Sequence, residues 1–238
     1  MVVLSAESLS HTYQSGATPV PALVEVSLDV EQGEFVAVVG PSGCGKSTLL
    51  HLCGAMEPPT SGRVTLEGSR LDALGEEGLT RVRRERLGFV FQFFNLLPTL
   101  SLIENVALPL LLAGRPRAEA LSRAEAWAGT LGLGHRLAHR PSQLSGGEMQ
   151  RAAIARAVVH DPALVIADEP TGNLDSTTGA RILDALVALN RTRGLTLLLA
   201  THAAEVAAAA HRVVHMRDGR IARIDDAGTR REPSRAAL

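Results

Sequence analysis

Lysine is almost absent from this chain: of its 238 residues, Lys46 is the only lysine, although lysine and arginine together number 24. Every other basic residue is therefore an arginine, which indicates that position 46 requires a compact ammonium that a guanidinium cannot replace. Cysteine is also scarce. Cys44 and Cys53 are too few for a disulfide framework, which favours a reducing compartment.

Three further absences limit the class of protein. The net charge is −1, so the basic excess of a nucleic-acid-binding surface is missing. No apolar run approaches the ~18 residues of a membrane span; the longest lie around 106–113 and 195–200. The N-terminus, residues 1–7, has no basic segment and reaches an acid early, unlike a signal peptide. We therefore expect a soluble, cytoplasmic protein that binds no nucleic acid and reaches a membrane only through a partner.

Runs of apolar residues predict an α/β fold. The stretches 35–39, 163–167 and 195–200 are apolar throughout, as in parallel strands covered on both faces. Residues 23–30 alternate instead, with Val24, Val26, Leu28 and Val30 expected on the buried face of an antiparallel strand. Helical patterns lie near 46–54, 146–159 and 177–193.

A glycine-rich loop follows the predicted strand at 35–39. It matches the phosphate-loop pattern G-x-x-x-x-G-K-[ST] and consists of Gly40, Pro41, Ser42, Gly43, Cys44, Gly45, Lys46, Ser47 and Thr48. Its backbone N–H groups close around a phosphate, and the helix that follows adds the positive end of its dipole. Lys46 then reaches the β- and γ-phosphates and Ser47 faces Mg²⁺. The loop therefore predicts binding of a nucleoside triphosphate.

The remaining segments suggest one folding unit with a tail. Residues 95–140 are rich in leucine and alanine with a helical period and no strand pattern, which predicts a helical insert. Asp218-Gly219 between two apolar runs predicts a closing hairpin with a type I′ turn. From Asp225 the chain is polar and unpatterned, so we expect a frayed tail at 225–238.

A second glycine-containing motif, Leu144-Ser145-Gly146-Gly147-Glu148, precedes a predicted helix and has two readings. Ser145 with Glu148 three residues later is a capping box, which would be purely structural. The neighbouring segments favour a functional motif. Residues 164–169 form an apolar strand that ends in Asp168 and Glu169, and carboxylates there orient Mg²⁺ and activate water.

Together these motifs resemble an ATP-binding-cassette (ABC) ATPase over residues 1 to 224. The matching set, in the order of the family, is the phosphate loop at 40–48, Gln92 after the strand at 87–91, LSGGE at 144–148, the acidic strand at 164–169, Asn-Leu-Asp at 173–175, and His202. The resemblance implies a P-loop NTPase core with a mostly parallel sheet, an antiparallel β subdomain and a helical subdomain at about 95–158. It also implies ATP and Mg²⁺ as cofactors.

The resemblance further implies a role for individual residues. Tyr13 stacks on adenine, and Gln92 contacts the metal and water and senses the transport partner. Asp168 supports Mg²⁺ together with Ser47, and Glu169 is the general base. His202 holds the γ-phosphate and the attacking water. Further nucleotide contacts are expected from Ser145, Gly146, Gly147, Glu148 and Asp175.

Two chains are expected to share each nucleotide. The phosphate loop and Ser145-Gly146-Gly147 are both anion-receiving helix N-termini, and in the family they lie too far apart in one subunit to hold one ATP. Head-to-tail stacking of two subunits brings them together and predicts a homodimer with two ATP molecules buried between the chains.

Two segments narrow the subgroup. The stretch after Gln92 contains Phe93, Phe94, Leu96 and Leu97, and Gly172-Asn173 stands where many importers have Ser-Ala. Both resemble the cassettes that pair with four-helix permeases, which act in lipoprotein release, macrolide or peptide efflux, and cell division. We expect these four apolar residues to form a docking patch for a permease helix, and Phe89 and Phe91 to be ordinary core.

The subgroup prediction leaves alternatives. A cassette of a solute importer remains possible, and a soluble ABC ATPase acting on DNA or ribosomes is less favoured because long coiled-coil inserts, tandem cassettes and basic linkers are missing. A P-loop kinase would need neither LSGGE nor His202.

Overall fold

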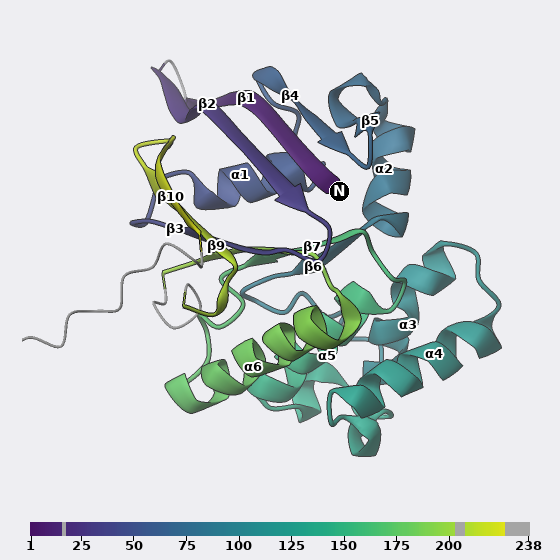
Figure 1. Ribbon diagram of the computed structural model, residues 1–238. Coiled ribbons are helices and arrows are strands. Elements are labelled where there is room, and N and C mark those ends of the chain that lie inside the picture. Colours follow the sequence, from purple (N-terminus) through teal and green to yellow (C-terminus); the bar gives the residue numbers. More distant parts are fainter. Residues whose placement is uncertain (16–17, 203–207, 227–238) are drawn as a thin grey trace, which may run out of the picture.

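Two β-sheets lie on either side of one helix in the computed structural model, which describes residues 1–15, 18–202 and 208–226. The helix, α1 (Lys46–Cys53), contacts strands of both sheets. On the far side of the larger sheet lie α3, α4, α5 and α6, so the molecule is layered as sheet, helix, sheet and helices (Figure 1). This is the predicted α/β architecture.

The larger sheet has the order β10-β9-β3-β8-β7-β6. Its parallel strands are β3 (Phe35–Val39), β6 (Leu87–Val90), β7 (Leu164–Asp168), β8 (Leu197–Thr201) and β9 (Arg212–Arg217). The three runs predicted from the sequence are therefore β3, β7 and β8. Their carboxyl ends meet at one edge of the sheet, which is where ligands bind in open α/β sheets.

Apolar runs without alternation form these strands because each face of the sheet has its own core. Phe35 and Ala37 of β3 pack among α3–α6, while Val36 and Val38 pack against α1 and the smaller sheet. A polar side chain on either face would be removed from water without a partner. The sequence is therefore apolar at consecutive positions.

The smaller sheet is antiparallel, in the order β2-β1-β4-β5, with β1 (Val2–Ser15), β2 (Thr18–Glu31), β4 (Ser61–Leu66) and β5 (Ser69–Arg70). Val26, Leu28 and Val30 are buried as predicted, but the prediction for Val24 was wrong: Leu23 is the buried residue there. Glu25 has φ +51°, beside shifts in the β1–β2 register, so the strand changes faces at this irregularity.

Helices fill the chain between β6 and β7. They are α3 (Leu102–Leu112), α4 (Arg117–Thr130), the short 3₁₀ turns η2 (Gly134–Arg136) and η3 (Pro141–Gln143), and α5 (Gly146–Val158). Ser101 and Glu104 cap α3 reciprocally. Outside this region lie η1 (Leu71–Ala73), α2 (Glu76–Glu85) and α6 (Ser176–Arg193).

The last described element is the hairpin of β9 and β10 (Arg220–Asp226). Asp218 and Gly219 both have positive φ, +48° and +74°, as the predicted type I′ turn requires. The strand continues through Asp225 and Asp226, past the expected start of the tail, because Asp225 pairs with Val213 and its Oδ2 lies 2.9 Å from His215 Nε2. The rest of the predicted tail, 227–238, lies outside the described residues.

Candidate nucleotide site

The glycine-rich loop leaves β3 at the carboxyl edge of the larger sheet and leads directly into α1. Two of its glycines are required by close backbone approaches. A Cβ on Gly40 would lie 2.4 Å from the carbonyl oxygen of Met216, and one on Gly45 would lie 2.5 Å from that of Ala22. Gly45 also has φ +99°, a conformation that glycine adopts without steric cost. The loop is therefore held between β2 and β9.

Lys46 lies inside this loop, with only 6% of the residue exposed. Its Nζ donates hydrogen bonds to the carbonyl oxygens of Gly40, at 2.9 Å, and Pro41, at 3.0 Å. An ammonium is a compact group with three donors, whereas a guanidinium is a broad planar fork. The small space between these carbonyls explains why this position retains lysine in a chain otherwise built with arginine.

A pocket of about 310 Å³ opens over the loop. Most of its lining is the phosphate loop itself, with an aromatic ring and an acid from other parts of the chain: Tyr13, Ala22, Ser42, Gly43, Gly45, Lys46, Ser47, Thr48 and Glu169. Backbone N–H groups, one ammonium and a helix N-terminus give the floor of the pocket a positive potential. The pocket is thus suited to a polyanion with a planar group at one end.

Two acids end β7 beside this pocket. The Oδ1 atom of Asp168 is buried and has no hydrogen-bond partner in the described part of the chain, which is costly for a carboxylate unless a cation or water binds it. Glu169 has φ +44°, and its Oε2 lies 3.0 Å from Nδ1 of His202. A strained backbone of this kind is common at functional sites.

Asp168 and Ser47 fit a Mg²⁺ ion that is also bound by phosphate oxygens. Within residues 1–15, 18–202 and 208–226, no group of three or more His, Cys, Asp or Glu side chains could hold a metal by itself. Mg²⁺ is usually bound by one or two carboxylates together with phosphate oxygens and water. Asp168 Oδ1, which has no partner among the described residues, and the hydroxyl oxygen of Ser47 are oxygen ligands of the kind that Mg²⁺ binds.

Gln92 is fixed at the turn after β6. Its Nε2 donates to Oδ1 of Asn173 at 3.3 Å, and Nδ2 of Asn173 donates to the Gln92 carbonyl at 3.0 Å. A Cβ on residue 172 would lie 2.9 Å from Gln92 Nε2 and would crowd this side chain. Glycine at 172 therefore leaves room for Gln92 to bond with Asn173. Asp175, two residues on, caps α6 by accepting from the Thr178 N–H at 2.9 Å.

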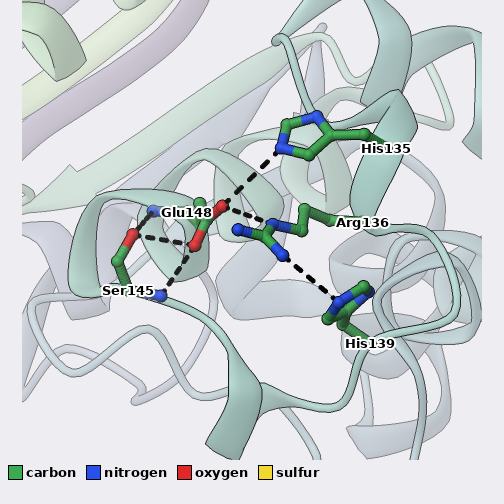
Figure 2. A network of polar contacts seen from close by, with 5 residues as sticks. All are labelled: His135, Arg136, His139, Ser145 and Glu148. Atoms are coloured by element: carbon green, nitrogen blue, oxygen red, sulfur yellow. Dashed lines mark hydrogen bonds and ion pairs between the residues drawn. The ribbon is translucent and has the colours of Figure 1, made fainter.

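The LSGGE segment forms the capping box that the sequence allowed (Figure 2). The Glu148 N–H donates to Ser145 Oγ at 3.3 Å, and the Ser145 N–H donates to Glu148 Oε2 at 2.8 Å. Arg136 Nε donates to the other carboxylate oxygen at 2.8 Å, and an Arg136 nitrogen lies 3.2 Å from His139 Nε2. The N-terminus of α5 is thus held by the helical region around it.

These contacts stabilise the charged form of Glu148. The backbone N–H of Ser145, above all, and the Arg136 guanidinium lower the pKa of Glu148 to about 2. The carboxylate therefore stays ionised well into the acid range, and its oxygens face Ser145 and Arg136. The N–H groups of the first turn of α5 still have no partner within the helix.

Comparison with known proteins identifies the family. Residues 23–172 match the family described as ABC transporter. The chain belongs to the ABC transporter family. It is 48% identical over 219 residues to the lipoprotein-releasing system ATP-binding protein LolD 2 of Caulobacter vibrioides, covering 92% of this chain and 96% of that protein. Identity to LolD of Shewanella denitrificans is 47% over 217 residues, covering 91% and 93%.

Solved structures agree with this assignment. The ATP-binding cassette MJ0796, in a dimeric post-hydrolysis state bound to ADP and Pi, superposes with a TM-score of 0.87 at 39% identity, covering 94% of this chain and 98% of that one. A dimeric structure of the same cassette gives 0.87 at 40% identity. The P-loop NTPase architecture predicted from the sequence is thereby confirmed, and the chain is an ABC ATPase that uses ATP with Mg²⁺.

The structure of this ABC ATPase brings some predicted residues together and separates others. The pocket contains Tyr13, the phosphate loop and Glu169, and His202 reaches it through Glu169. None of the residues that line the pocket comes from 144–148. Gly146 instead lies against Leu174 and Phe94. In one chain, the signature is not part of the pocket.

One residue of this cassette was missed by sequence reasoning. Gln150 on α5 is fully buried, and its Nε2 donates to the carbonyl oxygens of Pro170, at 2.6 Å, and Phe91, at 3.4 Å. It therefore joins the signature helix to the segments that carry Gln92 and Glu169. A polar residue on the buried face of a helix is a signal that could have identified it.

Proposed function

We propose that this ABC ATPase is the energy subunit of a membrane complex of the lipoprotein-releasing type. It acts as a homodimer that hydrolyses ATP and is held by a permease at the inner face of the cell membrane. The relatives support this by name, as ATP-binding proteins of a lipoprotein-releasing system. Among the described residues no helix is long and apolar enough to cross a membrane.

The pocket over the phosphate loop is the observation that carries the proposal. Its lining includes the Tyr13 ring, on which adenine would stack, and the phosphate loop, which would hold the triphosphate. In this arrangement Lys46 turns from the carbonyls of Gly40 and Pro41 to the β- and γ-phosphates. Ser47, Gln92 and Asp168 would hold Mg²⁺, which would supply positive charge beside the phosphate oxygens.

Glu169 and His202 supply the chemistry at the γ-phosphate. The carboxylate takes a proton from the attacking water, which is the action of a general base. His202, whose Nδ1 lies 3.0 Å from that carboxylate, orients it, and its ring would also contact the γ-phosphate. Cleavage produces ADP and phosphate and removes the group that holds the two subunits together.

The signature completes the site from the second subunit. Ser145, Gly146 and Gly147 lie outside the pocket of their own chain, at the start of a 13-residue helix whose first N–H groups can receive an anion. A head-to-tail dimer places them on the γ-phosphate of the partner's ATP. Asp175 and Glu148 shape the adjoining loops through their caps.

We also propose that residues 1–224 act as one nucleotide-binding domain, with the helical subdomain at about 95–158 inserted in it. A polar C-terminal tail is expected at 225–238, of which residues 225 and 226 belong to β10.

Lys46 provides a direct test of the phosphate site. Because it is the only lysine, an amine-acetylating reagent has two targets, its side chain and the exposed α-amino group of Met1. We expect ATP with Mg²⁺ to slow acetylation of Lys46 by about tenfold at a nucleotide concentration about ten times the Kd, because only the free fraction reacts. Mass spectrometry reads both sites, and the α-amino group is the internal control. Equal labelling of Lys46 with and without nucleotide would contradict phosphate binding by the loop.

An apolar surface beside Gln92 is the proposed permease contact. Phe93 and Leu97 are 72% and 44% exposed, whereas Leu96 is half-buried and packs against the core. Next to them lies a groove of about 490 Å³ lined by Phe89, Phe91 and residues of α3. Phe89 and Phe91 were expected to be core; they stack on each other 5.9 Å apart and are half-buried in the wall of this groove.

Replacing Phe93 and Leu97 together with serine should abolish co-purification with the permease in detergent, because an amphipathic helix docked on this exposed surface would lose its apolar contacts. The melting temperature and the ATPase activity of the isolated chain should stay unchanged, since both side chains are exposed. Ile224→Ser is the matched control: it is 44% exposed on β10, at the opposite edge of the larger sheet from β6. Retained co-purification, or a collapsed melting temperature, would assign the two residues to packing instead.

A further inference from the structure

A single carboxylate lies behind the aromatic ring at the end of the nucleotide pocket. The hydroxyl of Tyr13 donates to Oε2 of Glu57 at 2.9 Å. His51 Nδ1 lies 3.3 Å from the other oxygen, and His11 Nε2 lies 3.5 Å from Oε2. Glu57 therefore joins β1, which carries Tyr13 and His11, to α1, which begins in the phosphate loop.

The segment that carries Glu57 is stiff. Pro58 follows directly, which restricts Glu57 to extended conformations, and Pro59 fixes the next backbone angle. Thr60 is then tied to β1 twice: its N–H donates to the Ser10 carbonyl at 2.9 Å, and its Oγ1 accepts from the Thr12 N–H at 3.1 Å. The carboxylate is thus held at a defined place beside the strand that carries Tyr13.

Besides Glu57, the Tyr13 hydroxyl interacts with the side chain of Thr48, in the first turn of α1. Tyr13 is 39% exposed and lines the nucleotide pocket. The His11 ring packs nearly perpendicular to it, with centroids 4.6 Å apart. Partial burial raises the pKa of the Tyr13 hydroxyl above its ordinary value; the contact with Thr48 acts in the opposite direction, and the hydrogen bond to Glu57 raises the pKa again. A tyrosine hydroxyl is protonated at neutral pH in any case, so it is able to donate.

We infer that Glu57 is a positioning residue for nucleotide binding: it fixes the Tyr13 ring, through its hydroxyl, in the orientation on which the adenine of ATP stacks. This inference rests on the proposed function, in which Tyr13 stacks on adenine. Without the hydrogen bond to Glu57, a half-exposed tyrosine side chain would lose rotational freedom each time a nucleotide binds. With this hydrogen bond the Tyr13 ring is already ordered before ATP binds, so the affinity for ATP is higher.

The test compares ATP with inorganic triphosphate, which binds the phosphate loop but has no base. In Glu57→Ala, the Kd and KM for ATP should rise about three- to tenfold, the effect of releasing one immobilised side chain. The Kd for triphosphate and the kcat at saturating ATP should stay at the wild-type values. Glu57→Gln keeps an oxygen acceptor for the Tyr13 hydroxyl and should restore most of the affinity. Glu125→Ala, at an exposed position on α4, is the control for loss of an acid.

A second set of variants separates this inference from the proposed stacking. Tyr13→Phe keeps the ring but loses the hydrogen bond to Glu57 together with the contact to Thr48, so it should weaken ATP binding at least as much as Glu57→Ala. The double variant should be no weaker than Tyr13→Phe, because the hydrogen bond to Glu57 is already lost in that variant. Tyr13→Ala should weaken ATP further, with no effect on triphosphate.

The outcomes are distinguishable. If Tyr13→Ala binds ATP as tightly as the wild type, the stacking role of Tyr13 fails. If Tyr13→Ala weakens ATP but Glu57→Ala does not, stacking stands and the positioning role of Glu57 is refuted. Equal weakening of ATP and triphosphate in Glu57→Ala, or additive effects in the double variant, would also refute it, because Glu57 would then support the fold of the loop rather than the ring.

Discussion

Glu169→Gln is expected to lower the rate of ATP hydrolysis by about 10²- to 10⁴-fold, the range for loss of a general base. An amide cannot take the proton of the attacking water at neutral pH. Glutamine has the same shape and tolerates the same backbone, so the φ of +44° and a hydrogen bond to His202 are retained. The Kd for ATP should therefore change little.

Two measurements check this result. Phosphate release gives kcat, and size-exclusion chromatography with ATP and Mg²⁺ gives the oligomeric state. The variant should remain a dimer with ATP bound, whereas the wild type should return to monomer as ATP is consumed. Glu125→Gln, an exposed change on α4, should behave as wild type. Turnover by Glu169→Gln at the wild-type rate would mean that another group activates the water.

Gly146→Asp should reduce turnover by about 10²- to 10³-fold, the loss that follows removal of one donor at a developing negative charge. The new carboxylate would stand at the N-terminus of α5, where the partner's γ-phosphate is proposed to bind, and the two anions repel. The helix itself should tolerate the change, because an acid in its first turn interacts favourably with the dipole. The nearest atom to a Cβ there is Leu174 Cδ2, at 3.1 Å, the end of a flexible side chain.

The affinity of the isolated monomer for ATP distinguishes the two-chain site from a one-chain site. Equilibrium binding of a fluorescent ATP analogue at low protein concentration should give the wild-type Kd, since Gly146 lies outside the pocket of its own chain. Gly146→Asn has nearly the same shape without the charge and should lose less activity. A large loss of monomer affinity in Gly146→Asp would show that the signature serves its own subunit. Ser145→Arg is a less clean test, because it also removes the cap of α5, worth about 1 kcal/mol.

Much of the fold and of the site could be predicted from the sequence because the responsible interactions are local. The phosphate loop, the caps at Ser101 and Ser145, and the turn at Asp218-Gly219 each depend on neighbouring backbone groups. The buried strands could be recognised because a parallel sheet with a core on each face admits apolar residues at consecutive positions. These motifs, in their order along the chain, also determined the family and the need for ATP.

Only the tertiary structure decided which distant residues meet. No local pattern indicates that Glu57 accepts a hydrogen bond from Tyr13, or that Gln150 joins the carbonyls of Phe91 and Pro170. The change of face at Glu25 depends on its register with β1, and the extension of β10 to Asp226 depends on pairing with β9. Such contacts form between segments that the sequence separates by tens of residues, and their geometry is set by the packing of whole sheets and helices. Amino-acid order thus determined the chemistry of each segment, whereas folding determined which segments share a site.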